Sequence, residues 1–349
     1  MLITTIEEAW ELGTDMYHCS THLAVNYAMI RDVIIHIPSN PPNIYNDGAS
    51  TPGKTERARR LGIIGGCEEY TGAPYFVAHA ALVTGADLAH IICEQHAGTV
   101  IKSYSPDLIV HPYFQSYQNR NDASLEVIKE RVAKVIPKLH AISVGSGLGN
   151  DKYMLKCAEI AIKEAKESNL PIVFDADSLS IIGNSPSIVR GYKSAILSPN
   201  STEFEKLCKS LDIDANQNKT EAVKSISKAL GGVTVVLKGA TDIISNGEKV
   251  FYCDEKGGLR RCGGQGDVLS GTMATFLGWG RLYERNIWRH ELELDPDEIT
   301  MLAAFAGCLL TRHASRLAYE SCGRQTQTSS ILEFLPEAFE SRFGGRADD

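Results

Sequence analysis

Residues 257–271 combine a glycine-rich turn with one carboxylate at the start of an apolar run. The segment 263–267 reads Gly-Gly-Gln-Gly-Asp and leads directly into Val268–Trp279, a predicted helix. Such a turn leaves backbone N–H groups free at the positive end of the helix dipole, where an anion such as phosphate binds. Asp267 would then lie beside the phosphate, as required of a base that deprotonates a hydroxyl during phosphoryl transfer.

The same pattern also has a purely structural interpretation. Glycine loops before helices are common, and an aspartate in the first helical turn often serves only as a cap. The pattern alone therefore leaves a helix cap and an anion site open, and the rest of the chain must decide between them.

Composition narrows the class of protein. The chain has 349 residues, enough for one large α/β domain or two smaller ones, with 35 Lys and Arg against 43 Asp and Glu and a net charge of −8. That balance argues against binding to nucleic acid or to an anionic membrane. The nine cysteines form no Cys-x-x-Cys pair, which argues against zinc and suits a reducing compartment. Without a signal-peptide pattern or a membrane-length apolar run, we expect a cytoplasmic protein.

From residue 61 onward, short apolar runs alternate with helical segments. The predicted strands are Leu61–Ile64, Leu88–Cys93, Leu108–His111, Ala141–Val144, Ile172–Phe174, Ala195–Leu197 and Val233–Leu237. Helical segments include Ala73–Thr84, Ser124–Ile136, Lys152–Ser168 and Thr220–Leu230, and two last helices, Pro296–Ser321 and Leu335–Phe343, are expected only to cover the core. This alternation predicts an α/β fold with a mostly parallel central sheet and helices on both faces, formed by residues 61–349.

Residues 1–60 are predicted to be an N-terminal extension whose role the sequence leaves open. Residues 48–55 match the Walker A pattern, but turn-forming residues precede them and Pro52 removes a needed N–H donor, so we favour an ordinary loop. His18 and His22 are spaced to share a helix face and to bind a metal. No carboxylate pattern lies nearby, which is more typical of surface residues.

Four polar or glycine-rich loops each follow a predicted strand. They are residues 145–149, 175–177, 198–203 and 238–242. Ligands of parallel α/β sheets bind outside the carboxyl ends of the strands, so four such loops on one edge favour a functional site. The first loop, Gly-Ser-Gly-Leu-Gly, does not match the dinucleotide fingerprint, and no dehydrogenase is inferred from it.

Phosphoryl transfer also needs a cation beside the donor phosphates. Magnesium prefers oxygen ligands and keeps several waters, so one or two carboxylates or amides suffice to hold it. Asn200 and Glu203 lie at a predicted strand-to-helix entry and fit that role, directly or through water. They also match a helix-capping box, and both roles can hold together.

Several motifs together resemble the eukaryotic ATP-dependent NAD(P)H-hydrate dehydratases of the ribokinase-like superfamily. They are Gly65–Phe76 with its Tyr-Thr-Gly-Ala-Pro, Lys102–Leu108, Gly145–Gly149, Phe174–Leu179, the Asn-x-x-Glu-Phe at 200–204, Lys238-Gly239 and the Gly-Gly-Gln-Gly-Asp at 263–267. The resemblance covers about residues 60–345 in order. It implies a three-layer ribokinase-like fold.

The resemblance also implies a repair reaction on NADH or NADPH damaged by addition of water to the nicotinamide ring. ATP with Mg²⁺ would phosphorylate the ring hydroxyl, and loss of phosphate would restore the dihydropyridine. The hydrated nucleotide would contact Gly147, Asn200, Ser201, Thr202, Glu203, Phe204, Glu205, Lys206 and the catalytic Asp267. ATP would contact Lys238, Gly239, Ala240, Thr241, Asp242, Gly257, Gly258, Leu259, Arg260, Arg261, Cys262, Gly263, Gly264, Gln265 and Gly266.

Two rival functions remain open at this point. A related kinase would make a stable phosphorylated vitamin or sugar with the same phosphate chemistry, and a silent relative would bind nucleotide without turnover. Cys67 and Cys262 lie close to the predicted loops, where small buried fillers are favoured over a redox role. The sequence leaves the oligomeric state open, a homo-oligomer included, and also the preference between the two hydrates.

Overall fold

The computed structural model describes residues 59–344, except residues 119, 121–124, 217 and 287–293. The sequence at 48–55, the His18 and His22 pair and the predicted extension as far as residue 58 lie outside the described residues. Among the described helices, none has the combination of length and apolar character that crossing a membrane requires.

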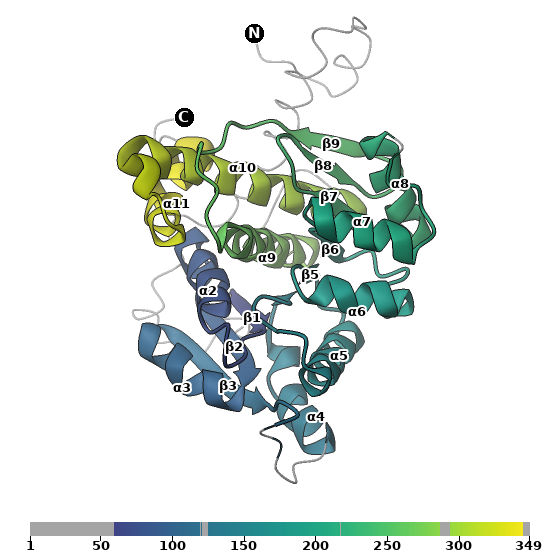
Figure 1. The fold of residues 1–349 in the computed structure, drawn as a ribbon, viewed down its shortest axis with the longest axis vertical. Coiled ribbons are helices and arrows are strands. Elements are labelled where there is room, and N and C mark those ends of the chain that lie inside the picture. Colours follow the sequence, from purple (N-terminus) through teal and green to yellow (C-terminus); the bar gives the residue numbers. More distant parts are fainter. Residues whose placement is uncertain (1–58, 119, 121–124, 217, 287–293, 345–349) are drawn as a thin grey trace, which may run out of the picture.

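A single sheet of nine strands forms the centre of the described fold. The strands are β1 (Arg60–Ile64), β2 (Leu88–Glu94), β3 (Leu108–Phe114), β4 (Ala141–Val144), β5 (Ile172–Phe174), β6 (Ala195–Leu197), β7 (Thr234–Leu237), β8 (Asp242–Ser245) and β9 (Val250–Cys253). Their order is β3-β2-β1-β4-β5-β6-β7-β8-β9, which runs from the lower to the upper edge of Figure 1. Strands β1 to β7 pair in parallel, and β8 and β9 add an antiparallel hairpin.

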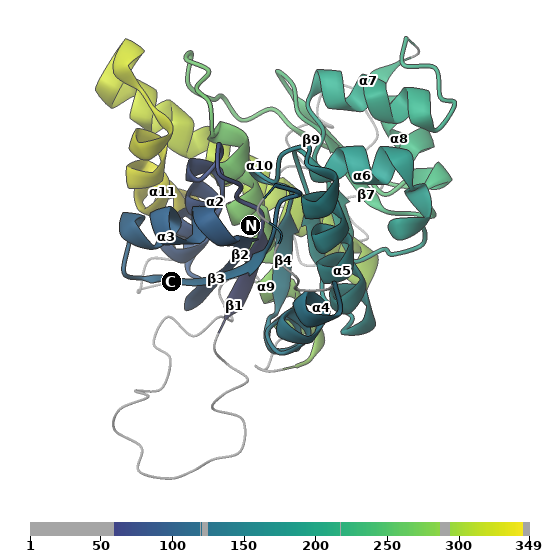
Figure 2. The same cartoon turned by 60° about the horizontal axis from the view of Figure 1, so that its bottom comes forward.

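Helices cover both faces of this sheet. They are α2 (Gly72–Thr84), α3 (Gln95–Tyr104), α4 (Leu125–Ala133), α5 (Lys152–Glu167), α6 (Ser178–Asn184), α7 (Ser201–Ser210), α8 (Lys219–Ala229), α9 (Gln265–Glu284), α10 (Pro296–Cys322) and α11 (Thr328–Phe343). Helices α4 to α8 pack on one face, and α2, α3 and α9 to α11 pack on the other. In Figures 1 and 2 the two groups lie on opposite sides of the strands, so the fold has three layers.

The central strands are short and apolar because each must bury side chains on both faces. In β5, Ile172 and Phe174 join the core under α4 to α8, while Val173 points into the core formed by α9 and α10. Polar side chains are therefore placed in the loops that follow the strands. This explains why the chemistry-bearing residues gather at one edge of the sheet.

Helix α9 is buried along nearly its whole length, from Val268 to Gly280. Gly271 allows α2 to approach closely, since a Cβ at this position would lie 2.3 Å from the Val77 carbonyl oxygen. A larger residue would push the two helices apart. The first turn of α9, which carries Asp267, is thus fixed by the core behind it.

The structure confirms the predicted parallel strands and most helix positions. Two features differ from the sequence-based expectation. The β8–β9 hairpin was not predicted, although Asn246-Gly247 is a typical hairpin turn. Helix α11 begins at Thr328 rather than Leu335, because Pro336 lies inside the helix and does not start it.

Candidate active site

A cavity of about 970 Å³ opens where β5, β6 and β7 end and where α7 and α9 begin. That volume suits a nucleotide together with a second small molecule. Most of the residues predicted for the site line it: Asn200, Ser201, Thr202, Glu203, Lys238, Gly239, Ala240, Asp242, Gly257, Gly258, Arg261, Cys262, Gly263, Gly264, Gln265, Gly266 and Asp267. Three loops far apart in sequence therefore meet around one cavity.

Seven predicted residues lie away from the cavity wall. They are Gly147, Phe204, Glu205, Lys206, Thr241, Leu259 and Arg260. Phe204 is 3% exposed and packs in the core under α4 to α8. Leu259, in contrast, is 86% exposed. The side chain of Phe204 is therefore part of the hydrophobic core and does not face the cavity.

The first turn of α9 faces the cavity without a side-chain cap. Gly264 is the N-cap residue with φ of 90°, a left-handed conformation that favours glycine, and no described side chain bonds to the free N–H groups there. By comparison, Asp151 caps α5 and Asn200 caps α7. Asp267 lies in the first turn, beyond the cap position. The backbone N–H groups are therefore left for an anionic ligand.

Lys238 connects the strand ends to α9. Its amine donates a hydrogen bond to Asp175 Oδ1 at 2.6 Å, and the other oxygen of Asp175 accepts a hydrogen bond from Ser270 Oγ at 2.7 Å. Burial lowers the pKa of Lys238, but the charges of Asp175, Glu203 and Asp267 raise it more, and the net direction is upward. Lys238 is thus a fixed cation at the floor of the cavity.

Asp267 has a pKa raised to about 7. Burial is the largest cause, and the charge of Asp175 adds to it, whereas the neighbouring Ser146 hydroxyl and Lys238 lower the value. A carboxylate with this pKa is an effective proton acceptor near neutral pH, because it exchanges protons with little free-energy cost. A helix cap needs no such environment, whereas a raised pKa suits a group that accepts a proton.

The loops after β4 and β5 contribute polar groups close to the Asp267 carboxylate. Asp177 accepts a hydrogen bond from the Gly149 N–H at 2.8 Å. Ala176 between the two aspartates has φ of 48°, an unfavourable value for a residue other than glycine. A Cβ on Gly145 would lie 1.9 Å from the Asp175 carbonyl oxygen, so only glycine fits there.

Asn200 and Glu203 form the capping box that their spacing predicted. Asn200 Oδ1 accepts the Glu203 N–H at 3.0 Å, and Glu203 Oε2 accepts the Asn200 N–H at 2.7 Å. Burial raises the pKa of Glu203, while the Asn200 N–H and Lys238 lower it. The box engages one carboxylate oxygen and leaves the second for a hydrated metal ion, so the residues fit Mg²⁺ through water.

The structure also brings in residues to which sequence reasoning assigned no individual role. Asp175, which the sequence placed only in a loop after a strand, lines the cavity and accepts a hydrogen bond from Ser270, and Thr311, Arg312 and Ser315 of α10 also line the cavity. Helix α10 was expected only to cover the core. The signal was present, because an arginine that closely follows the apolar run Met301–Leu310 on the same helix indicates a buried ion pair.

The two thiols near the loops differ in their surroundings. Cys67 is 7% exposed, and burial together with its hydrogen bond to Glu69 raises the pKa of the thiol to about 11. It stays protonated at neutral pH and is therefore a poor nucleophile. Cys262 lines the cavity and accepts a contact from Thr328 Oγ1 at 3.5 Å. Both positions suit small fillers.

The described architecture is a ribokinase-like fold. Solved structures share the architecture: a ribokinase-like superfamily protein from Enterococcus faecalis has a TM-score of 0.65 at 17% identity, covering 90% of this chain and 95% of that one. An ADP/ATP-dependent NAD(P)H-hydrate dehydratase from Bacillus subtilis, co-crystallized with ATP/Mg²⁺, has a TM-score of 0.59 at 17% identity and covers 89% and 97%.

The family follows from sequence comparison. A family model described as NAD(P)H-hydrate dehydratase matches residues 61–337. An ATP-dependent (S)-NAD(P)H-hydrate dehydratase from Phaeosphaeria nodorum is 42% identical, over 83% of this chain and 90% of that protein. A protein of the same name from Rattus norvegicus is 38% identical, over 94% and 93%. The chain belongs to the NAD(P)H-hydrate dehydratase family.

Proposed function

We propose that this protein catalyses the ATP-dependent dehydration of hydrated NADH and NADPH. One observation carries the proposal: an uncapped helix N-terminus, Lys238 and the carboxylate of Asp267 line a single cavity. These are the anion cradle, the cation and the base that phosphoryl transfer to a hydroxyl requires. The relatives from Phaeosphaeria nodorum and Rattus norvegicus, which this chain matches over 90% and 93% of their length, are named for this activity.

The reaction proceeds in two balanced stages. Asp267 accepts the proton of the ring hydroxyl while the hydroxyl oxygen attacks the γ-phosphorus of ATP. ADP leaves with the electrons of the broken P–O bond. The ring C–O bond then breaks, phosphate departs with that oxygen and the bonding electrons, and a neighbouring ring carbon loses a proton to water. The products are ADP, phosphate and the restored dihydropyridine. Phosphorylation serves here to make the hydroxyl a leaving group.

The cavity divides between the two substrates. We assign ATP to the loops Lys238–Asp242 and Gly257–Gly266, because these carry the glycines and the cation. The hydrated nucleotide is assigned to Asn200, Ser201, Thr202, Glu203 and Asp267, the predicted contacts that line the cavity. Asn200 and Glu203 would hold Mg²⁺ through water, and the ion would supply positive charge beside the donor phosphates. Three carboxylates, those of Asp175, Glu203 and Asp267, lie around Lys238, so a further positive charge would be stabilised there.

An absorbance assay tests the proposed reaction. Purified protein with hydrated NADH, Mg²⁺ and ATP should restore the reduced-nicotinamide absorbance band, and replacing ATP with ADP identifies the donor. A vitamin or sugar kinase would instead accumulate a stable phosphate ester with ATP. Turnover of such an alcohol, with hydrated NADH left untouched, would refute the proposal.

The rate should follow the protonation of Asp267. Since the base must be ionised and its pKa is raised to about 7, kcat/KM should fall as the pH drops below 7. The slope should approach about tenfold per pH unit on the acid side. Measuring kcat/KM for hydrated NADH at saturating ATP from pH 5.5 to 8.5 checks this. A rate that is flat across pH 7 would show that Asp267 is not the base.

A further inference from the structure

Arg312 on α10 contacts both loops of the ATP side of the cavity. Its Nε and Nη2 donate to the two carboxylate oxygens of Asp242, each at 2.6 Å. Nη2 also donates to the Gly239 carbonyl at 2.6 Å, and Nη1 donates to the carbonyls of Ala240 at 2.9 Å and Glu255 at 3.1 Å. The guanidinium therefore bridges the β7–β8 turn and the loop after β9.

All five N–H donors of the guanidinium are engaged in these bonds. An arginine has five such donors and no more. Although Arg312 lines the cavity, it has no donor free for a phosphate oxygen. This distinguishes it from an arginine that contacts the transferring phosphoryl group, since such a residue must keep donors available.

Asp242 is engaged in the same way. Its two carboxylate oxygens accept hydrogen bonds from Arg312, and Oδ1 also accepts a hydrogen bond from the Gly239 N–H at 2.9 Å. Its side chain is 6% exposed, and that of Arg312 is 15% exposed. The charge and hydrogen bonds of Asp242 outweigh burial and raise the pKa of Arg312. The ion pair is therefore largely buried and is bonded to the β7–β8 turn.

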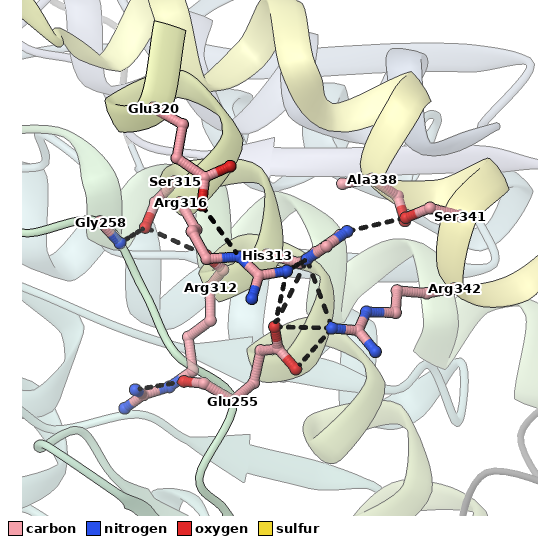
Figure 3. Close-up of polar contacts among 10 residues, drawn as sticks. All are labelled: Glu255, Gly258, Arg312, His313, Ser315, Arg316, Glu320, Ala338, Ser341 and Arg342. Atoms are coloured by element: carbon pink, nitrogen blue, oxygen red, sulfur yellow. Dashed lines mark hydrogen bonds and ion pairs between the residues drawn. The ribbon is translucent and has the colours of Figure 1, made fainter. Parts of the chain in front are cut away.

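Residues near Arg312 on α10 also hold the loop after β9. Ser315 Oγ accepts the Gly258 N–H at 2.9 Å, and Arg342 of α11 donates to both oxygens of Glu255 at 2.8 Å. His313 and Arg316 lie 3.4 and 3.5 Å from Glu255 Oε1. Figure 3 shows His313, Arg316 and Arg342 gathered around the Glu255 carboxylate, with Arg312 on the other side of Glu255.

We propose that Arg312 and Asp242 are positioning residues that hold the two ATP-binding loops in a ligand-ready arrangement before ATP arrives. The inference rests on the proposed function for the identity of the ligand. It changes the role expected for Asp242, which acts through Arg312 rather than by contact with ATP. Preorganised loops bind more tightly because less ordering is required on binding.

Arg312→Lys tests the proposal, because an ammonium has three donors and cannot span both loops. In the nucleotide-free protein, hydrogen exchange of the backbone amides at 239–242 and 255–258 should accelerate about tenfold. Calorimetry should show ATP–Mg²⁺ binding weakened about 10- to 100-fold, from loss of two or more hydrogen bonds to a charged group. The KM for hydrated NADH should stay nearly unchanged.

Two further variants sharpen the test. Asp242→Asn should reproduce both effects, and the double variant should be little worse than either single one, because the two residues act as a unit. Arg281→Lys, which alters an ion pair with Glu284 on α9, is the matched control and should change neither quantity.

The outcomes separate this inference from the proposed function. Unchanged loop exchange in Arg312→Lys would overturn the positioning role, even if ATP affinity fell, since that result would mark a direct ligand. Faster exchange with unaltered ATP affinity would also overturn it. Failure of the wild-type protein to bind ATP would contradict the proposed function, while the exchange measurement still reports on the loops.

Discussion

Replacing Asp267 with asparagine should abolish turnover while ATP remains bound. Asparagine fills the same space but accepts no proton, so the ring hydroxyl loses its base at the moment of phosphoryl transfer. The expected loss in kcat is about 10²- to 10⁴-fold, the range for a general base. ATP affinity should stay within about 3-fold of wild type, because the removed interaction belongs to the transition state. Steady-state kinetics and calorimetry measure the two quantities.

The matched control for this variant is Asp212→Asn. Asp212 is exposed after α7 and has φ of 57°, a conformation that asparagine also tolerates, so activity should be retained. Wild-type turnover in Asp267→Asn would exclude the carboxylate as the base. Unfolding of that variant would instead support a structural capping role, and circular dichroism distinguishes the two.

Lys238→Met should weaken ATP binding and also shift the pH profile. The variant removes the cation that lowers the pKa of Asp267, so the acid limb of kcat/KM should move above pH 7. ATP loses a charged donor, which predicts an affinity lower by about 10- to 100-fold. Asp175 also loses its 2.6 Å partner and becomes a buried unpaired carboxylate. A pH titration of kcat/KM and calorimetry with ATP–Mg²⁺ measure both effects.

Lys163→Met provides the comparison, since Lys163 is an exposed partner of Glu167 on α5. It should leave ATP affinity and the pH profile unchanged. If Lys238→Met kept the wild-type pH limb and bound ATP normally, Lys238 would have no electrostatic role at the site.

Local patterns predicted the parallel strands well because both faces of each strand are buried. A run such as Ala141–Val144 buries all four of its residues when it lies in the middle of a sheet, and the structure places the strand at the same residues. The hairpin of β8 and β9 was harder to predict, since β9 is an edge strand with Tyr252 exposed. Its pattern therefore lacks a continuous apolar signal.

The candidate site was predictable only in part, and for a physical reason. Glycines, Lys238 and Asp267 follow strands or start helices, so their places follow from the order of elements. Arg312 lies in mid-helix, three of its five hydrogen bonds go to backbone carbonyls that any residue provides, and its carboxylate partner Asp242 lies far away in the sequence. The raised pKa of Asp267 likewise comes from burial among distant groups, which sequence spacing does not encode.

The central claim is that the ring oxygen leaves as part of the phosphate. Hydrated NADH prepared with oxygen-18 in the ring hydroxyl tests it, with ATP and Mg²⁺ in unlabelled water and mass spectrometry of the products. Substrate recovered at partial conversion must still carry the label as a control. The proposed mechanism predicts one labelled oxygen in each released phosphate. Unlabelled phosphate, with the oxygen-18 found in water, would contradict it.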